Sequence, residues 1–490
     1  MGRDGVDGHV PAGMSGPQWA KVLDQSRCIG CDACTAACRS ENQVPIGITR
    51  TWLKATEVGA YPQPRRHLQV MRCNHCEDAP CVSICPTGAM HRRPDGIVDV
   101  DRSACIGCRA CMVACPYDAV ALDPEEHTAD KCSFCAHRID MGLEPACVAA
   151  CPVDAILVGD LADPTSRVAK VVQREPVAVR RPEKGTRPRV FYRGAAHATL
   201  DPLAPAPGRP ATVADVIVGN EGEVPQAWGG RTTPAMWAWV IATGVAPAAL
   251  VAMLGGQGTG QRLWTMIPPL VALGLLALGA AGMLLSVGRP ARLPLLLLRP
   301  QRRSWLARAA ALLGLYGVVM ALVVLLTAIG QAVVTPWLLG AGAIGGLAAA
   351  GASACVLAQA AGRDLWQSPV LVVRSLAGSL ASGAAILVLP AALTLPRGVW
   401  PLAIVVGAAC AAHLVLALAE VATPRPTAHG RLAVRELTRG RGAVLFWFGN
   451  AGVALAMLSP LLPPLAALAP IGLLGYDHAY LEAGQSVRLA

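Results

Sequence analysis

Charged and aromatic residues are scarce in this sequence. Asp, Glu, Lys and Arg together make up 15% of the 490 residues and Phe, Trp and Tyr make up 4%, whereas 53% are hydrophobic. So few charges exclude treating the chain as one soluble globular domain. No Asp, Glu, Lys or Arg occurs from Ala309 to Gly362, and a charge-free stretch of that length is typical of a lipid-embedded segment. The sequence therefore predicts a division into a polar part and a membrane part.

The N-terminal residues are not expected to be a secretory leader. Residues 1–18 contain no apolar h-region, no small-residue cleavage site and no twin-arginine pair, so we expect the front domain to stay in the cytoplasm. Sixteen of the eighteen cysteines lie between Cys28 and Cys151. Because the cytoplasm keeps thiols reduced, this density favours metal ligands over eight disulfides. The remaining two, Cys355 and Cys410, lie in apolar runs and are predicted to be small packing residues.

Two of the four cysteine groups have the spacing of bacterial ferredoxins. They are CIGCDACTAAC, with Cys28, Cys31, Cys34 and Cys38, and CIGCRACMVACP, with Cys105, Cys108, Cys111 and Cys115. In the spacing C-x2-C-x2-C-x3-C, three close cysteines surround one cubane cluster on a tight loop. The fourth cysteine lies about one helical turn further on and ligates a different cluster. Each group therefore needs a partner group.

The other two groups keep the closing C-x3-C-P. They are CNHCEDAPCVSICP, with Cys73, Cys76, Cys81 and Cys85, and CSFCAHRIDMGLEPACVAACP, with Cys132, Cys135, Cys147 and Cys151. Structural zinc is the competing interpretation, because C-x2-C pairs also form tetrahedral four-cysteine sites. Zinc does not explain four cysteines per group, the proline after three of the groups, or two identical ferredoxin runs. Iron–sulfur clusters are favoured, since thiolate sulfur suits them.

Residues 20–195 resemble a known family, the iron–sulfur subunits of the dimethyl sulfoxide reductase and polysulfide reductase group of molybdenum enzymes. The resemblance rests on AACRSEN, CPTGAM, DGIVDVDRSACIGC, CPYDA, KCSFCAHR and GTRPRVFY. It implies an α+β double ferredoxin-like domain in which the first group pairs with the fourth and the second with the third. The implied ligand sets are Cys28, Cys31, Cys34 and Cys151; Cys132, Cys135, Cys147 and Cys38; Cys73, Cys76, Cys81 and Cys115; and Cys105, Cys108, Cys111 and Cys85. All sixteen positions are cysteine, so we expect four 4Fe-4S clusters.

A row of one-electron carriers makes an electron path between two distant sites. His75 and His137 lie inside the cysteine groups and could be ligands, as in Rieske centres. With a full set of cysteines, we instead expect these histidines to pack or to hydrogen-bond within the loops. Catalytic residues are not expected in this chain, because it has no G-x-G-x-x-G after a strand and no recognisable molybdenum-binding pattern.

After residue 232 the sequence predicts an all-α bundle of seven or eight transmembrane helices. The expected spans are 235–255, 265–287, 306–329, 334–358, 370–394, 399–421 and 443–461, with a proline-broken eighth near 463–481. The expected domains are a tail at 1–20, the cluster domain at 21–195, a linker at 196–232, the helix bundle at 233–482 and a tail at 483–490. The arginine run before the linker lacks a nucleic-acid recognition pattern and fits a solvated face or a lipid headgroup contact.

Arginine counts predict the orientation. The loops after the second, fourth and sixth helices hold thirteen arginines with their adjoining helix ends, and the alternate loops hold two, Arg262 and Arg397. Arginine-rich loops stay in the cytoplasm, so the cluster domain is expected on the cytoplasmic side of the inner membrane. Arg308 and Arg374 are expected to be anchors of this kind.

The helical part resembles the NrfD-like membrane anchors of polysulfide and dimethyl sulfoxide reductases, through SVGRPARLPLLLLRPQRRSW, DLWQSP and YLEAGQ. That resemblance implies a quinone site without haem. Haem b usually needs two histidines within the helices, and His413 alone lies clearly inside one, so no haem is expected. Intramembrane polar groups mark functional sites, and the candidates for binding menaquinone or ubiquinone are His413, Glu420, Asn450 and Trp447. A histidine bonded to a neighbouring helix is the alternative for His413.

Together these features predict an electron-transfer and membrane-anchor subunit of an oxidoreductase complex. It carries electrons between the quinone pool and a separate molybdopterin-containing catalytic subunit. Two alternatives remain, a redox-driven proton- or ion-translocating module and a passive membrane-anchored ferredoxin. The first is disfavoured because the third and fourth helices have almost no ionisable side chains to form a proton path. Ligand spacing does not determine the direction of electron flow.

Overall fold

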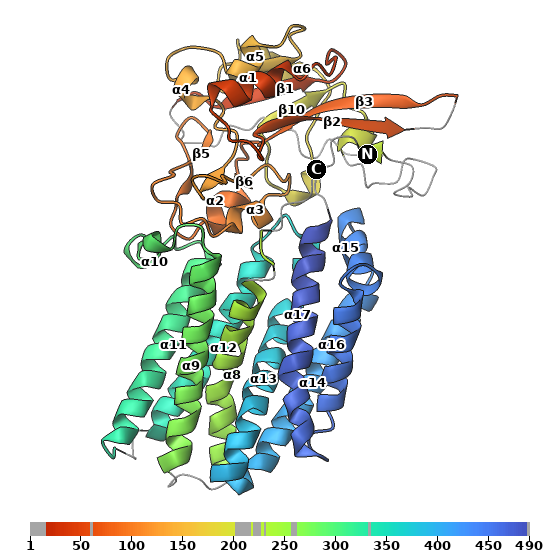
Figure 1. Cartoon of the computed structure of the whole chain (residues 1–490). Helices are drawn as coiled ribbons and strands as arrows, with labels where there is room; N and C mark the ends of the chain where they lie inside the picture. The colour runs from red at the N-terminus through yellow and green to blue at the C-terminus, as the bar shows by residue number, and fades with distance from the viewer. Residues whose placement is uncertain are drawn as a thin grey trace. The chain divides into compact units, whose positions relative to one another are not determined.

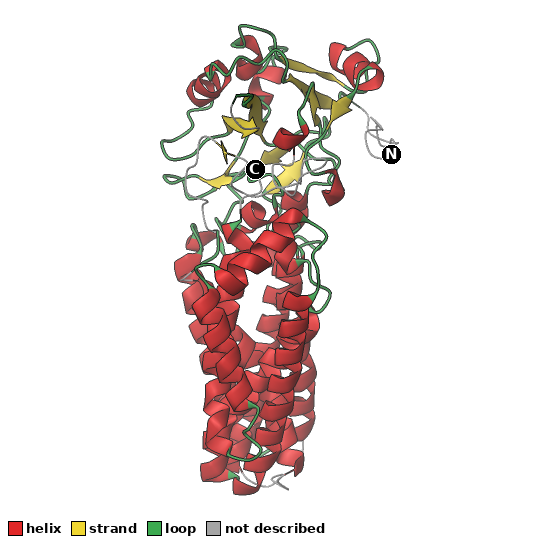
Figure 2. Ribbon diagram, turned by 90° about the vertical axis from the view of Figure 1, so that its right-hand side faces the viewer, coloured by secondary structure: helices red, strands yellow, loops and turns green. Residues whose placement is uncertain are grey.

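A computed structural model of the chain describes residues 16–58, 62–200, 217–218, 227–229, 232–255, 262–331 and 335–487. The chain forms two compact units, one of residues 1–225 with 488–490 and the other of residues 226–487. The first fifteen residues and most of the expected linker, 201–216, 219–226 and 230–231, lie outside the described residues. Within the described part, strands occur in the first unit and the second is helical (Figure 2).

A four-stranded sheet forms the core of the first unit. Its strand order is β8 (Ile156–Asp160), β1 (Trp19–Asp24), β10 (Val190–Arg193) and β9 (Val177–Ala178), in which β1 runs antiparallel to β8 and parallel to β10. Side chains alternate between the two faces of a strand. Ala20 and Val22 pack with Val168 of helix α6 (Arg167–Arg174), whereas Leu23 packs with Cys34 on the opposite face. One face of the sheet therefore meets the cysteine loops.

The rest of the first unit is built from hairpins and short helices. Strands β2 (Thr51–Val58) and β3 (Arg65–Arg72) form an antiparallel hairpin, and β11 (Ile217–Val218), inside the expected linker, pairs with β2. Two smaller pairs are β4 (Met90–Arg92) with β5 (Val98–Val100) and β6 (Ala121–Leu122) with β7 (Ala129–Asp130). The short helices are α1 (Ala33–Glu41), α2 (Pro80–Ile84), α3 (Ala110–Ala114), α4 (Ala136–Ile139), α5 (Ala146–Ala149), α7 (His197–Leu200) and the 3-10 turn η1 (Pro182–Lys184).

The second unit is a bundle of helices that run side by side (Figure 1). Its long helices are α8 (Thr232–Gly255), α9 (Arg262–Ser286), α11 (Trp305–Ala328), α12 (Thr335–Ala358), α13 (Leu371–Thr394), α14 (Val399–Ala422), α16 (Ala443–Ala456) and α17 (Leu468–Ser486). Shorter elements join them: η3 (Pro290–Arg292), α10 (Leu295–Leu298), η4 (Asp364–Trp366), η5 (Pro396–Gly398), α15 (Ala428–Arg439) and η6 (Pro463–Ala467).

The described residues therefore contain a helix at each of the eight positions that the sequence predicts. Six of them, α8, α9, α11, α12, α13 and α14, are long and apolar enough to cross a membrane. The seventh segment forms a shorter helix than expected, ending at Ala456. The eighth is interrupted by prolines at its start, where η6 forms, and then continues as α17 to Ser486.

Small residues let the helix backbones approach closely. A Cβ atom on Gly244 of α8 would lie 1.8 Å from the carbonyl oxygen of Ser379 in α13, and one on Gly383 would lie 2.2 Å from the backbone of Gly244. Beside this crossing, the hydroxyls of Thr243 and Ser379 are 3.0 Å apart and share a hydrogen bond. The small residues therefore let α8 and α13 pack in direct backbone contact.

Candidate functional site: four cysteine sets and a buried polar cluster

Each C-x2-C loop contains a left-handed turn at the same place. The residue before the second cysteine has a positive φ in all four groups: 73° at Gly30, 43° at His75, 72° at Gly107 and 62° at Phe134. Glycine adopts this conformation without a steric penalty, whereas His75 and Phe134 adopt one that is uncommon for residues with a side chain. The four groups thus share one backbone fold although two of them lack the glycine.

The structure brings cysteines from different groups together. Cys28 interacts electrostatically with Cys31 and Cys151, and Cys38 with Cys132 and Cys135. Two cavities show the same arrangement. One is lined by Cys38, Cys132, Cys135 and Cys147, and the other by Cys85, Cys105, Cys108 and Cys111.

The remaining set gathers in the same way. Cys76 and Cys81 each interact electrostatically with Cys73 and Cys115. In every set, three cysteines come from one group and the fourth from its partner group. All sixteen thiols are free of disulfides. Four thiols per set are the ligand number that a 4Fe-4S cluster requires.

The four sets form a row and are numbered along it. Cys34 of the first set interacts with Cys147 of the second. Cys132 of the second set interacts with Cys73 of the third, and Cys81 of the third set interacts with Cys111 of the fourth.

The exposure of the cysteines to solvent changes along this row. All eight cysteines of the two middle sets are buried. At one end Cys31 is exposed, and at the other end Cys108 is partly exposed. The row thus runs through the interior and reaches the surface of its unit at its ends.

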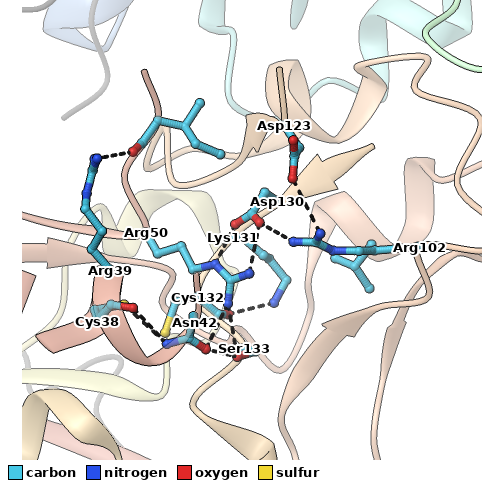
Figure 3. Close-up of polar contacts among 12 residues, drawn as sticks. Cys38, Arg39, Asn42, Arg50, Arg102, Asp123, Asp130, Lys131, Cys132 and Ser133 are labelled. Carbon is cyan, nitrogen blue, oxygen red and sulfur yellow. Dashed lines mark hydrogen bonds and ion pairs between the residues drawn. The ribbon is translucent and has the colours of Figure 1, made fainter. Parts of the chain in front are cut away.

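Polar residues surround the second set, which consists of Cys38, Cys132, Cys135 and Cys147. Figure 3 shows several of these contacts. The Asn42 side-chain amide donates to the sulfurs of Cys38 and Cys135, at 3.8 and 3.7 Å. Arg50 donates to both carboxylate oxygens of Asp130, at 2.6 and 2.9 Å, so its charge is paired. Burial raises the pKa of Cys38 to about 12, and thiols of this kind become ligands only when a metal replaces the proton.

The two histidines inside the cysteine groups have other partners. His75 is 1% exposed, and its Nδ1 accepts a hydrogen bond from the backbone N–H of Val98 at 3.1 Å. Its pKa lies well below the ordinary value, because burial and then the nearby Lys131, Lys21 and Arg72 disfavour a second proton. His137 is half-exposed and lies 2.8 Å from a carboxylate oxygen of Glu41. Each histidine therefore contacts a partner outside its own cysteine group, Val98 for His75 and Glu41 for His137, rather than within the loop as expected.

In the helical unit, Glu420 lies at the centre of a buried polar cluster. Its carboxylate forms ion pairs with Arg374 of α13 and with Arg425, the latter at 3.1 Å. Tyr480 of α17 donates to the same carboxylate at 2.8 Å. Arg374 is 3% exposed, donates to the hydroxyl of Tyr476, and lies 4.0 Å from the ring centroid of Tyr480. This corrects the expectation that Arg374 is an anchor at the membrane surface, because Glu420 and the two tyrosines hold it inside the bundle.

His413 lies beside this cluster on the same helix as Glu420. It is 2% exposed, and its ring packs edge-on against Tyr476, with 4.8 Å between the ring centroids. Among the residues that the structure describes, neither ring nitrogen has a hydrogen-bond partner of ordinary geometry, although the backbone of Arg374 is near. A buried polar group without a partner is costly.

Asn450 and Trp447 lie on α16 and differ in their surroundings. Asn450 is 4% exposed; its amide nitrogen donates to the carbonyl of Phe446 at 2.8 Å and its oxygen has no partner. Phe446 packs against Tyr476 with 5.6 Å between ring centroids, which links Asn450 to the cluster. Trp447 is 50% exposed and donates to the carbonyl of Thr438 at 3.1 Å. The structure therefore places Trp447 on the outer surface, unlike the other three candidates.

Sequence reasoning missed the two tyrosines of α17 and two cations beside the cysteines, Lys21 and Arg72. A signal exists for the tyrosines and for Lys21, but not for Arg72. Tyr476 and Tyr480 are four residues apart and so share one face of a helix. Lys21 stands between Ala20 and Val22 in a strand that is buried from Ala20 to Asp24, and a lysine there is unexpected unless it is paired.

Comparisons with known proteins agree with this arrangement. Residues 67–161 match the model of a 4Fe-4S dicluster domain, and residues 25–41 match that of a 4Fe-4S binding domain. The B subunit of tetrathionate reductase from Salmonella typhimurium is 45% identical over 190 residues, which are 38% of this chain and 76% of that protein. The fold and the cysteine sets thus define an iron–sulfur protein of the ferredoxin type.

Two further relatives show to which group of ferredoxin-type iron–sulfur proteins this chain is similar. The B subunit of polysulfide reductase from Wolinella succinogenes is 41% identical over 177 residues, 36% of this chain and 93% of that protein. The putative iron–sulfur subunit of dimethyl sulfoxide reductase from Halobacterium salinarum is 39% identical over 203 residues, 35% of this chain and 77% of that protein. This protein belongs to the family of the iron–sulfur subunits of the dimethyl sulfoxide reductase and polysulfide reductase group, here joined to a bundle of membrane-capable helices.

Proposed function

We propose that the chain carries electrons through four 4Fe-4S clusters between a lipid-soluble quinone and a separate catalytic subunit. The observation that carries the proposal is the row of four cysteine sets, buried in the middle and reaching the surface at both ends. A 4Fe-4S cluster takes up and releases one electron when bound. The residues of this chain hold each cluster with three cysteines of one group and the fourth cysteine of its partner group.

The helical unit supplies the membrane anchor and the proposed quinone site. Quinone carbonyls accept hydrogen bonds, and the unpartnered imidazole of His413 can donate one from inside the bundle. Asn450 contributes a second polar group. The oxygens of Glu420 are occupied by Arg374, Arg425 and Tyr480, so Glu420 is a positioning residue that holds Arg374 and Tyr476 beside His413. Trp447, half-exposed, fits an interfacial aromatic anchor.

The exposed set at one end of the row is the proposed contact with the catalytic subunit. Cys31 is exposed, and Ile29 in the same loop exposes 61% of its surface, which suits a protein partner better than water. From the family membership, we expect that partner to be a molybdopterin-containing reductase subunit. The arginine-rich loops support a cytoplasmic position for the cluster unit at the inner membrane.

A reduction assay with quinol tests the proposal. The purified chain in detergent, with oxidised clusters, is mixed with a short-chain quinol, and cluster reduction is followed by electron paramagnetic resonance (EPR). We expect quinol to reduce the clusters. A His413→Ala change should slow this reaction at least about tenfold, because it removes a buried hydrogen-bond donor to the quinone.

His478→Ala is the matched control, since it removes a helix histidine that is only partly buried and lies 3.9 Å from Glu482. It should react at the wild-type rate. If dithionite reduces the clusters and quinol does not, the quinone assignment is wrong and the chain is a passive membrane-anchored ferredoxin. A His413→Ala variant with an unchanged rate would remove that residue from the site.

A further inference from the structure

The second cysteine set is surrounded by positive charge, unlike the fourth. Its cavity, lined by Cys38, Cys132, Cys135 and Cys147, is also lined by the three cationic residues Lys21, Arg50 and Arg72. The cavity of the fourth set is lined mainly by apolar residues, such as Met90, Val100 and Leu122, and by one cation, Arg109. The two cavities therefore present similar sulfur ligands in different electrostatic surroundings.

Within the described part of the chain, two of the three cations of the second cavity form hydrogen bonds to sulfur and none to a carboxylate. Arg72, 1% exposed, donates through Nη1 to the sulfur of Cys147 at 3.1 Å, and its Nε and Nη2 have no hydrogen-bond partner. Lys21, also 1% exposed, lies 3.7 Å from the same sulfur and 4.0 Å from the ring centroid of Phe134. A buried cation without a counter-charge is strongly unfavourable, so the thiolates of this set are the natural counter-charge.

The fold places both cations there. Lys21 is on β1, on the face opposite to Ala20 and Val22, which face α6, and this alternation points it toward the cysteine loops. Arg72 is the last residue of β3, paired with Thr51 of β2. Together they place two positive charges within 3.7 Å of the sulfur of Cys147.

We propose that Lys21 and Arg72 raise the reduction potential of the cluster held by Cys38, Cys132, Cys135 and Cys147 above those of the other three. Adding one electron makes a cluster more negative, and a fixed buried cation stabilises that state more than the oxidised one. The electron of a singly reduced chain therefore resides at this fully buried site. The inference rests on the proposed function, because it requires a cluster in this cavity.

Lys131 is the cation that could raise the reduction potential of the third set instead. It interacts electrostatically with Cys73 and Cys81 of the third set. Its ammonium group donates to the backbone carbonyls of Val98 and Cys132, so it is partly solvated by the backbone, whereas Arg72 donates directly to a ligand sulfur. At the first set, the exposure of Cys31 lets water screen the charges. The second set therefore experiences the strongest unscreened positive field.

A redox titration with dithionite, followed by EPR on the full chain in detergent, tests the proposal. Lys21→Met and Arg72→Met should each lower the midpoint of the highest-potential step by at least a tenfold change in its equilibrium constant, which is about 59 mV for one electron. The other three steps should move less. Arg72→Lys keeps the charge and should retain most of the potential. Lys170→Met, the same chemical change at an exposed position of α6, should leave all four steps unchanged.

Asn42→Asp is a milder second variant, at a partly buried position whose amide donates to the sulfurs of Cys38 and Cys135. It adds negative charge near the same cavity and should lower the same step, even if the methionine variants fail to assemble. Equal shifts of all four steps, or none in the highest step, would overturn the inference. Cys135→Ala separates it from the proposed function: loss of the highest step is expected, whereas loss of no step means that the cavity holds no cluster.

Discussion

A Cys38→Ala variant should lose the same cluster as a Cys135→Ala variant, although Cys38 stands in the sequence motif of Cys31. Cys38 and Cys135 interact electrostatically and line one cavity, with Cys132 and Cys147. Removing one of four thiolates abolishes or converts a 4Fe-4S site. Each variant should therefore lose about a quarter of the bound iron, or somewhat less where a smaller cluster survives. The measurement is the iron content together with the EPR spectrum of the reduced chain.

The EPR signals that each variant loses show whether a cluster takes ligands from two cysteine groups or from one group alone. Cys31→Ala and Cys151→Ala should remove one common signal that differs from the signal removed by Cys38→Ala. Cys410→Ala is the control, because Cys410 is buried among apolar residues of the helix bundle, and it should leave the iron content unchanged. If Cys38→Ala and Cys31→Ala removed the same signal, the proposed ligand sets would be wrong.

Replacing Arg374 by methionine should destabilise the helix bundle by about 3–5 kcal/mol, the usual cost of leaving one member of a buried ion pair without its partner. Glu420 is 2% exposed by its side chain and is paired with Arg374. Arg374 also donates to Tyr476 and stacks on Tyr480, so its loss affects α13, α14 and α17 together. The measurement is the unfolding temperature of the detergent-solubilised chain, read from tryptophan fluorescence.

The double variant Arg374→Met with Glu420→Gln tests whether the unpaired charge of Glu420 causes this loss of stability. It removes both charges, so it should be more stable than Arg374→Met alone. Arg308→Met is the matched control, since Arg308 is exposed and lies 4.7 Å from the ring centroid of Trp305; it should cost less than about 1 kcal/mol. A single variant as stable as the control would show that the buried pair contributes little.

Much of the architecture could be predicted from local patterns. The apolar runs locate eight helices because a segment in lipid must satisfy its backbone internally, which leaves a long apolar helix as the simplest solution. The C-x2-C spacing predicted the cluster-binding domains because it reports directly on loop geometry. The shortened seventh helix was missed, since the apolar residues after Ala456 continue the hydropathy signal while the chain turns toward Pro463 and Pro464.

The details that govern function depend on contacts between distant residues. Arg374 looks like a positive-inside anchor in sequence, and its inward position becomes evident only when Glu420, 46 residues later, lies beside it. Arg72 and Cys147 are 75 residues apart, and nothing in either local sequence predicts that they meet. The outward position of Trp447 was also not predicted, because the spacing of apolar residues along a short helix does not tell which face packs inward.

The central claim is that sixteen cysteines form one connected row of four clusters, and a complete EPR redox titration of the whole chain tests it most directly. We expect four one-electron steps, with signals that broaden and split as neighbouring sites become reduced together, because adjacent sets lie close enough to interact. Fewer than four reducible centres, isolated signals without mutual broadening, or near-stoichiometric zinc in place of iron would contradict it.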